Sequence, residues 1–244
     1  MNGVLAISGR ELRAFFLSPG GYVVAAMFMV ANGWLFVRHV FSPGEIATLR
    51  PVFAFGMIVF VLVCPAVSMR LISEELRLGT IETLMTSPIT TSQIIAGKFI
   101  AAMGFLAALL LPTLGFVVAL EVYGRPDYGE LACGYMGLLM AGGLFLSSGI
   151  LASTLTANQV VAYLITVFFW LLVILLTKGL PQTDLLPVAW RDGAAGLLGF
   201  IDTEWRMRDF SIGLLDTANI VYFVSATVIM LVAASRSLEV RRWR

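Results

Sequence analysis

The sequence predicts an all-α integral membrane protein with six transmembrane helices, and this prediction rests on composition, hydropathy and the placement of charge. Of its 244 residues, 59% are hydrophobic and 13% are charged, and the mean hydropathy is +0.92. A soluble domain is about half apolar, so this chain carries more apolar surface than one aqueous core can hide. Because a span needs about 20 apolar residues, the bilayer is its natural solvent.

Six stretches contain no Asp, Glu, Lys, Arg or His and are long enough to cross a bilayer. They are roughly residues 21–37, 51–69, 99–120, 131–153, 159–177 and 217–235, and they predict one transmembrane permease domain over residues 1–244. An even number of spans places both termini on one side. Lys and Arg favour the cytoplasmic side, and four arginines follow the last span closely: Arg236, Arg241, Arg242 and Arg244. We therefore expect cytoplasmic termini.

Three short segments outside the spans have amphipathic or interfacial patterns. Met1–Leu17 lacks the pattern of a cleavable signal and intersperses charged with apolar side chains. Between the fifth and sixth spans, Gly193–Ile201 is apolar but too short to cross, so we expect it to be re-entrant or interfacial. Asp202–Phe210 mixes charged and apolar residues, which is typical of a surface-lying helix.

Several self-sufficient functions are disfavoured by what the spans lack. Proton-coupled transporters and pumps need ionisable groups at membrane depth, and the six stretches contain none. No catalytic or metal-binding constellation is expected, because His39 is the only histidine, and Cys64 and Cys133 lack metal-ligand spacing. A P-loop is missing, since Lys98 is followed by Phe99 instead of Ser or Thr. A net charge of +1 gives no basic field for nucleic acid. Any energy for transport is therefore expected to arrive from another chain.

The segment after the second span has the pattern of a helix held below the membrane. The second span is expected to continue to about Arg77, carrying Glu74 and Glu75 into water. Gly79 suits the left-handed conformation that ends many helices. Thr80 could then cap a new, short helix.

That short helix would present a small apolar ridge. Ile81, Leu84 and Met85 share one face by their spacing. Glu82 lies in the first turn, where the helix dipole favours a carboxylate, and Pro88 ends the helix. Such a ridge suits a partner's groove, and rigid extensions of the spans would pass the partner's movement into the bilayer. A loop resting on lipid headgroups is the alternative interpretation.

The same segment resembles the coupling region of type 2 ABC exporter permeases. The matching residues are Glu74-Glu75, Gly79-Thr80, Glu82, Ser87-Pro88 and Gly97-Lys98. Both ends of the chain resemble the gliding-motility-type permease subgroup. The N-terminal match comprises Arg10-Glu11-Leu12, Phe15-Phe16, Ser18-Pro19 and Tyr22. The C-terminal match comprises Phe210, Gly213, Asp216, Tyr222-Phe223, Leu238-Glu239 and Arg241-Arg242-Trp243. No motif of the family is recognised between about Glu121 and Arg208.

The resemblance implies a location, a set of partners and a docking site. It implies a multi-pass protein of the bacterial inner (cytoplasmic) membrane, with both termini cytoplasmic. Ile7–Ser18, which includes Arg10, Glu11, Arg13, Phe15 and Phe16, would form an amphipathic elbow helix on the inner leaflet. Two permease copies, identical or different, would bind two copies of a separate ATPase, which would hold ATP and Mg²⁺. Gly79–Ser87 would be the coupling helix, and a membrane-anchored extracytoplasmic protein would accompany the complex.

The fourth span is rich in small residues. Gly143 and Ser147, and likewise Gly149 and Ser153, have the small-xxx-small spacing that lets helices approach closely. Packing inside one bundle is one interpretation of these residues. A subunit contact or a translocation path is the other.

Three functions remain to be weighed. The first is a membrane-spanning permease subunit of an ABC transporter complex. The second is a non-transporting membrane anchor or mechanochemical scaffold for an ABC ATPase that acts on the cell envelope. The third, a secondary transporter or intramembrane enzyme, is disfavoured by the charge-free spans. The substrate stays open, because apolar spans suit a hydrophobic cargo and a lipid-facing surface equally well.

Overall fold

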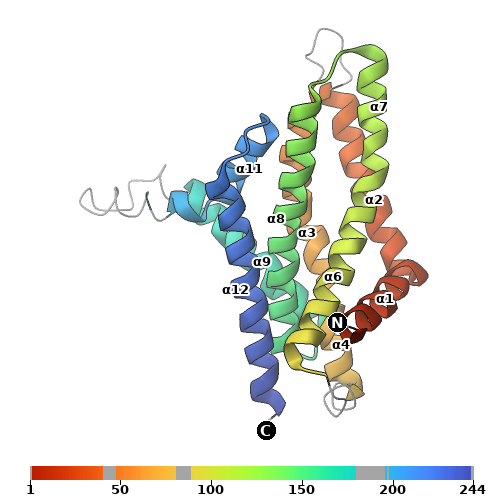
Figure 1. Ribbon diagram of the computed structural model, residues 1–244, viewed down its shortest axis with the longest axis vertical. Helices are drawn as coiled ribbons and strands as arrows, with labels where there is room; N and C mark the ends of the chain where they lie inside the picture. The colour runs from red at the N-terminus through yellow and green to blue at the C-terminus, as the bar shows by residue number, and fades with distance from the viewer. Residues whose placement is uncertain (1, 41–47, 81–88, 180–195, 197, 243–244) are drawn as a thin grey trace.

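In the computed structural model of the protein, the described residues are 2–40, 48–80, 89–179, 196 and 198–242. These residues form helices and turns and no strand (Figure 1). Six helices are long and apolar enough to cross a membrane: Pro19–Val40, Arg50–Leu78, Thr91–Tyr123, Tyr128–Leu155, Gln159–Gly179 and Thr217–Arg241. Each contains one of the six predicted stretches, so the predicted number of spans is confirmed.

The second span consists of two helices in series. Helix α3 (Arg50–Ser68) is followed, after Met69, by α4 (Arg70–Leu78). Gly79 then adopts a left-handed conformation with φ 71° and ends α4. The span therefore continues past its apolar part into a short polar helix, at the position where the sequence predicts a helix end.

The first and third spans also contain short irregular turns. Helix α2 (Pro19–Leu35) is capped by Ser18 and passes into the π-helical turn η1 (Phe36–Val40). Helix α6 (Thr91–Leu110) begins with a capping box in which Thr90 and Gln93 bond each other's backbone N–H. The chain then passes through a 3₁₀ turn, η2 (Leu111–Thr113), into α7 (Leu114–Tyr123).

Helix α8 (Tyr128–Leu155) is the centre of the bundle. It packs against α3, α6, α9 (Gln159–Gly179), α11 (Thr203–Ser211) and α12 (Thr217–Arg242). Of its apolar window, 78% is buried, against 22% in α9 and 17% in α12. The small residues of α8 allow this packing, whereas α9 and α12 turn most of their apolar surface outward.

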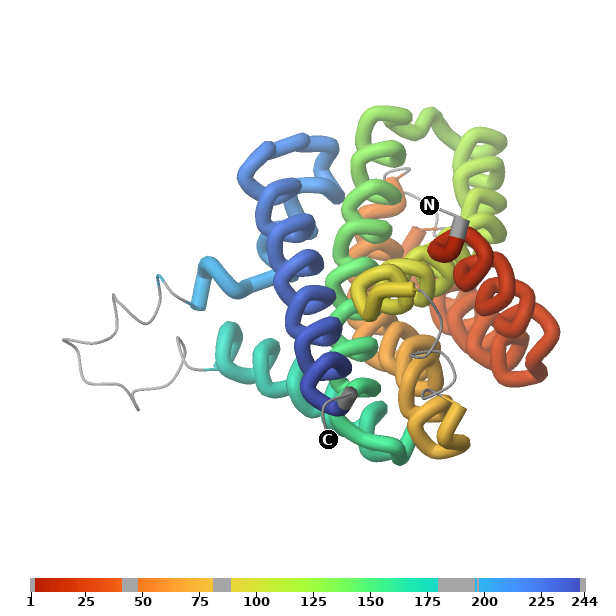
Figure 2. Tube along the Cα trace, turned by 60° about the horizontal axis from the view of Figure 1, so that its bottom comes forward, coloured from red at the N-terminus to blue at the C-terminus, as the bar shows by residue number. Residues whose placement is uncertain are grey.

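Helix α1 (Asn2–Leu17) lies obliquely across one end of the bundle (Figure 1). It contacts α6, and Figure 2 shows the two helices side by side. The two chain ends marked in Figure 1 lie at this same end of the bundle, as an even number of spans requires.

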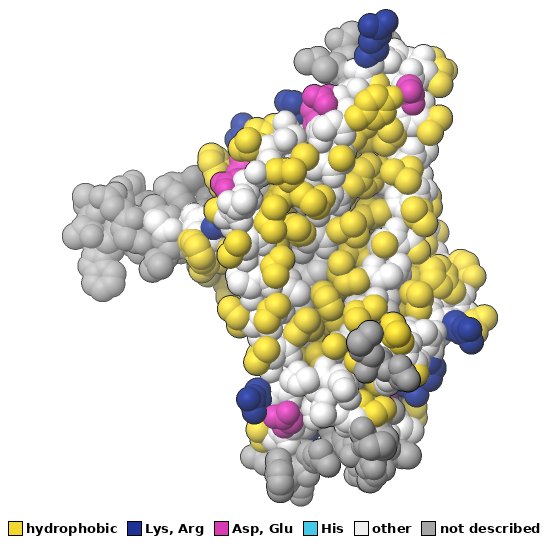
Figure 3. All heavy atoms as spheres, viewed as in Figure 1, with side chains coloured by type: hydrophobic (Ala, Val, Ile, Leu, Met, Phe, Trp, Pro, Cys, Tyr) yellow, Lys and Arg dark blue, Asp and Glu magenta, His cyan; other side chains and the backbone are white. Residues whose placement is uncertain are grey.

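The outer surface has the polarity of a membrane protein. On the face shown in Figure 3, charged side chains lie in its upper and lower parts, and a broad apolar band separates them. Elsewhere on the spans, exposed apolar side chains include Val30, Leu172 and Val228. A bilayer rather than water is the solvent that such a band requires.

Helix α11 differs from the predicted surface-lying helix. It begins after the cap residue Asp202, and Trp205 is exposed, but Met207 and Phe210 are buried in the bundle. Phe210 packs beside Phe223 of α12, with ring centres 6.1 Å apart. The helix therefore belongs to the protein core on one side. Of the predicted re-entrant piece 193–201, residues 196 and 198–201 are described and helical, and the rest lies outside the described residues.

Candidate functional site

Lys98, near the start of α6, is the centre of a buried charge cluster where α1, α4 and α6 meet. Its side chain is 1% exposed. The ammonium group donates to the carbonyl oxygen of Leu71 at 2.6 Å, to Oε1 of Glu75 at 2.8 Å and to Oε1 of Glu11 at 3.2 Å. An ammonium group has three donors, and here all three have acceptors. A charge whose burial would otherwise be costly is therefore fully paired.

Arg10 adds a second cation to this cluster. Its Nη2 lies 2.9 Å from Oε1 of Glu11 and 3.4 Å from Oε1 of Glu75. Two cations and two carboxylates, from three helices, thus form a neutral group, which we call the Lys98 cluster (Arg10, Glu11, Glu75 and Lys98). Oε2 of Glu75 is buried and has no hydrogen-bond partner among the described residues.

The electrostatics of the cluster favour the ionised form of Glu11. Burial raises the pKa of Glu11, but the charge of Lys98 and hydrogen bonds from Arg10 and Lys98 lower it by more. The pKa of Glu11 therefore lies below its ordinary value of 4.5. Ionised Glu11 pairs with both Arg10 and Lys98.

Gly97 explains how α1 comes close enough to reach Lys98. A Cβ at Gly97 would lie 2.9 Å from Cγ2 of Ile7 and 3.1 Å from the carbonyl oxygen of Val4. Any larger residue would push the two helices apart. Gly97 thus allows the close contact between α1 and α6, and this contact buries the charge of the neighbouring Lys98.

The other residues predicted for the N-terminal helix face in different directions. Phe15 is buried and stacks on Phe105 of α6, with ring centres 4.9 Å apart. The guanidinium of Arg70 lies 4.4 Å from the Phe15 ring centre, which is within the range of a cation–π contact. Arg13 and Phe16 are exposed. One side of α1 therefore packs against α4 and α6, and the other faces outward.

A second buried contact holds α4 against the central helix α8. Oγ of Ser153 accepts hydrogen bonds from the backbone N–H groups of Ile72 at 3.0 Å and Ser73 at 2.8 Å. It also donates to the carbonyl oxygen of Met69 at 3.0 Å. The first four N–H groups of a helix have no partner within that helix. Ser153 therefore caps α4 from a different span.

The remaining small residues of α8 also lie between helices of this chain. A Cβ at Gly149 would overlap Oγ of Ser68 and lie 2.9 Å from the Ser68 Cβ. Ser147 is fully buried. A Cβ at Gly143 would lie 3.4 Å from Sδ of Met103 on α6. Gly149 and Ser153 thus pack α8 against α3 and α4, and Gly143 faces α6.

The residues predicted to dock a partner are only partly described. Glu75 belongs to the Lys98 cluster, Glu74 beside it is half-buried, and Gly79 and Thr80 are exposed. The others lie within residues 81–88, outside the described residues: Ile81, Glu82, Leu84, Met85, Ser87 and Pro88. The surface predicted to meet an ATPase therefore stays a prediction. The structure describes only the base of this surface, which is the end of α4 and the start of α6.

The sequence predicts Ser153 as a helix-packing residue and Gly97-Lys98 as part of the coupling region, but it does not identify the hydrogen bonds and ion pairs that Lys98 and Ser153 make at this base. Lys98 carries one signal that could have found it. It is the only Lys or Arg between Arg77 and Arg125, and it stands at the foot of an apolar span. A lone cation in that position requires a carboxylate partner. Ser153 carries no such signal, because a serine in a small-residue span is common.

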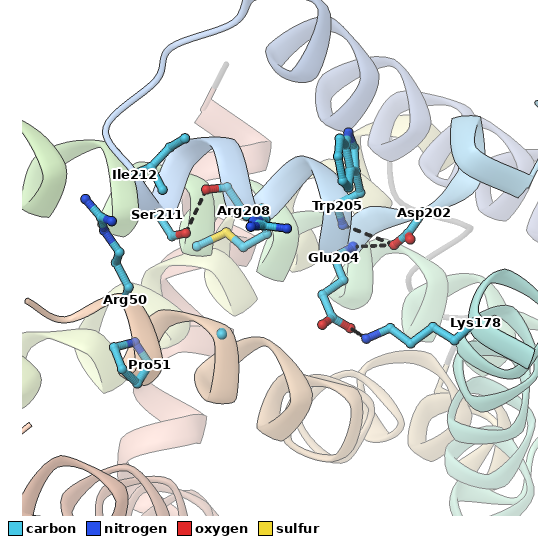
Figure 4. A pocket seen from close by; sticks show the side chains of 11 residues that line it. Arg50, Pro51, Lys178, Asp202, Glu204, Trp205, Arg208, Ser211 and Ile212 are labelled. Carbon is cyan, nitrogen blue, oxygen red and sulfur yellow. Dashed lines mark hydrogen bonds and ion pairs between the residues drawn. The ribbon is translucent and has the colours of Figure 1, made fainter. Parts of the chain in front are cut away.

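The opposite end of the bundle has its own polar contacts. Arg50 at the start of α3 pairs with Glu130 of α8, with Nη2 to Oε2 at 2.7 Å, and Thr48 also bonds that carboxylate. Beside it lies an open cavity of about 560 Å³, shown in Figure 4, where Lys178 pairs with Glu204. Among the described residues, no group of three or more His, Cys, Asp or Glu could hold a metal ion.

Six apolar spans, one of which is the tightly packed central helix α8, define a multi-pass membrane protein. Its charged groups form pairs at the two ends of the bundle. Residues 12–189, well over half of the chain, match the family described as ABC-2 family transporter protein. The chain belongs to this family.

Two curated relatives are similar to the chain. The probable multidrug ABC transporter permease YbhR of Escherichia coli (strain K12) is 29% identical to it over 117 residues. The protein of the same name from Escherichia coli O157:H7 has the same values. The aligned stretch covers 48% of this chain and 31% of the relative. The chain thus spans about a third of the length of the curated relatives it matches.

Proposed function

We propose that this chain is the membrane-spanning permease subunit of an ABC transporter complex, in which a separate ATPase subunit hydrolyses ATP. The observation that supports this most is the Lys98 cluster. It ties the N-terminal helix, the end of the second span and the start of the third span into one unit. Gly79–Ser87, which the sequence predicts as the coupling helix, lies in the chain between two of those elements, the second span and the third.

Two contacts would pass a partner's movement into the membrane. Ser153 links α4 to the central helix α8, and Lys98 links α4 to α6 and α1. A push on residues 81–88 would therefore move α4 and α6 together instead of bending a loop. Because α8 packs against most other helices, the displacement would reach the bundle as rigid-body motion.

The proposed complex follows from family membership and from the motifs at both chain ends. It contains two permease copies, identical or different, and two ATPase copies that bind ATP and Mg²⁺. Both termini face the cytoplasm of a bacterial inner membrane. Within the family we assign the chain to the gliding-motility-type subgroup, with a membrane-anchored extracytoplasmic partner. Export is the proposed direction, because the relatives are named as multidrug transporter permeases.

ATPase activity in reconstituted vesicles tests whether ATP hydrolysis belongs to the separate ATPase subunit and not to this chain. The purified chain alone is expected to show none, and activity is expected to appear with the ATPase subunit. Hydrolysis by the chain alone, free of contaminants, would contradict the proposal. ATP-dependent movement of a solute or lipid distinguishes a transporter from a scaffold that only remodels the envelope.

Substitution of Leu84 by Glu tests the coupling helix. A charge on the predicted apolar ridge should abolish capture of the ATPase in a pull-down while leaving membrane insertion intact. Leu155→Glu is a matched control, because Leu155 is an exposed leucine at the end of α8 on the same side of the membrane. Equal capture by both variants would refute docking at Gly79–Ser87.

A further inference from the structure

Two neighbouring hollows lie between α6 and α12. The mid-membrane hollow, of about 380 Å³, has α8 as its floor and includes Met103, Met140 and Phe223. The second hollow, of about 360 Å³, leads toward the end of the bundle that carries the termini. Val228 and Leu231 line both hollows. We call the two together the groove, and each has the size of a small-molecule site.

The polarity of the groove changes along its length. The mid-membrane part has apolar walls apart from one threonine, and it contains three flexible methionines that adapt to an irregular occupant: Met103, Met136 and Met140. The other end is lined by Ser92, Ser235, Arg236 and Glu239. An occupant with an apolar body and a polar head matches this change.

The dimensions fit one leaflet of a bilayer. On α12 the apolar lining runs from Phe223 to Val232, which at 1.5 Å per residue is about 14 Å. One leaflet of the hydrocarbon core is about 15 Å deep. Ser235, Arg236 and Glu239 follow directly, at the level where a headgroup would lie.

The charges at the polar end favour a zwitterionic headgroup. Arg236 Nη1 lies 3.2 Å from Glu239 Oε2, and the two side chains are 78% and 38% exposed. Such a surface pair contributes little in water, so exchanging it for contacts with a ligand costs little. Arg236 can hold a phosphate through two N–H groups, and Glu239 can accept hydrogen bonds from a primary ammonium. A choline group has no N–H to donate, and an anionic headgroup would meet the Glu239 carboxylate.

We propose that this groove binds one phospholipid with a primary-amine zwitterionic headgroup, such as phosphatidylethanolamine, from the leaflet on the side of the termini. Its headgroup lies between Arg236 and Glu239, and an acyl chain lies along α6, α8 and α12.

Native mass spectrometry of the purified full chain tests the site. The probes are phosphatidylethanolamine, phosphatidylcholine and phosphatidylglycerol, added at equal concentration in mild detergent. The wild type is expected to retain one phosphatidylethanolamine about tenfold more often than either competitor, as one charge-assisted hydrogen bond would give. Glu239→Gln should remove most of the preference over phosphatidylcholine. Arg236→Gln should lower retention of all three lipids.

Two further variants separate the headgroup from the apolar groove. Gly143→Leu places a side chain in the groove, where a Cβ meets only side chains at 3.4 Å or more, and should reduce retention of every lipid. Arg241→Gln is the matched control, because Arg241 is an exposed arginine of α12 that does not line the groove, and it should change nothing.

Three results would overturn the proposal. Equal retention of the three lipids would indicate an unspecific lipid shell. A preference for phosphatidylglycerol would indicate an anion site. The third result is a dimer that carries no bound lipid and that dissociates more readily in the Gly143→Leu variant. It would show that a second copy of the chain covers the groove.

Discussion

Replacement of Lys98 by Met removes the charge but keeps a side chain of similar length. This substitution should strongly destabilise the bundle. The Lys98 ammonium group lies 2.8 Å from Glu75 and 3.2 Å from Glu11. At the effective dielectric constant of about 20 that suits such pairs, the gross attraction is about 6 kcal/mol for the first pair and about 5 kcal/mol for the second. Desolvation of the ions offsets much of this. Removal of Lys98 leaves two largely buried carboxylates, 16% and 14% exposed, with Arg10 alone. Loss of one partner of a buried ion pair costs about 3–5 kcal/mol.

The free energy of unfolding can be followed by SDS titration in mixed micelles, with thiol labelling as the signal. Cys64 and Cys133 are free and buried, so both react only when the bundle opens. Lys178→Met is the control, since its pair with Glu204 is half-exposed and such pairs contribute about 0–1 kcal/mol. A Lys98→Met variant within about 1 kcal/mol of the control would refute the view that this cluster holds the helices together.

Two further predictions concern other contacts. Gly149→Ala should cost about 1–3 kcal/mol of unfolding free energy, because the new Cβ overlaps Ser68. Gly115→Ala, with no atom within 4 Å, should cost nothing in the same titration, and equal losses in both would contradict the close-contact argument. Acidification tests Glu11: because its folded-state pKa is lowered, its stabilising contribution is present above about pH 4.3 and is lost as the pH falls through the folded-state pKa. A Glu11→Gln variant should lose less stability between pH 5 and pH 3 than the wild type, and parallel curves would exclude the carboxylate as the cause.

The number of spans could be predicted because the bilayer imposes one simple requirement on sequence. Each span needs an uninterrupted apolar stretch of fixed length, and that can be read without knowledge of neighbours. The left-handed Gly79 is similarly local, since it depends on the backbone of one residue. Features of this kind need no knowledge of distant contacts.

The Lys98 cluster could not be predicted because it joins residues far apart in the chain. Glu11 and Lys98 are separated by 87 positions, and their contact depends on how closely α1 approaches α6 at Gly97. Helix α11 shows the same difficulty in another form. The sequence predicts a surface-lying helix there, but Met207 and Phe210 pack against protein. A Cβ at Gly137 of α8 would lie 2.7 Å from the Phe210 Cβ. An apolar periodicity shows that a face is buried but does not show what covers it.

The order of charges along the chain has a consequence for biogenesis. Arg10, Glu11 and Glu75 are synthesised before Lys98, so the first three members of the cluster emerge from the ribosome without their central partner. Helix α1 and the end of the second span already share the Arg10–Glu75 and Arg70–Phe15 contacts, but their two carboxylates gain the buried ammonium group only when the third span is made. We therefore expect the arrival of Lys98 during synthesis to strengthen the attachment of the N-terminal helix to the spans. A nascent chain arrested before Lys98 should leave α1 open to protease, whereas one arrested after the third span should protect it.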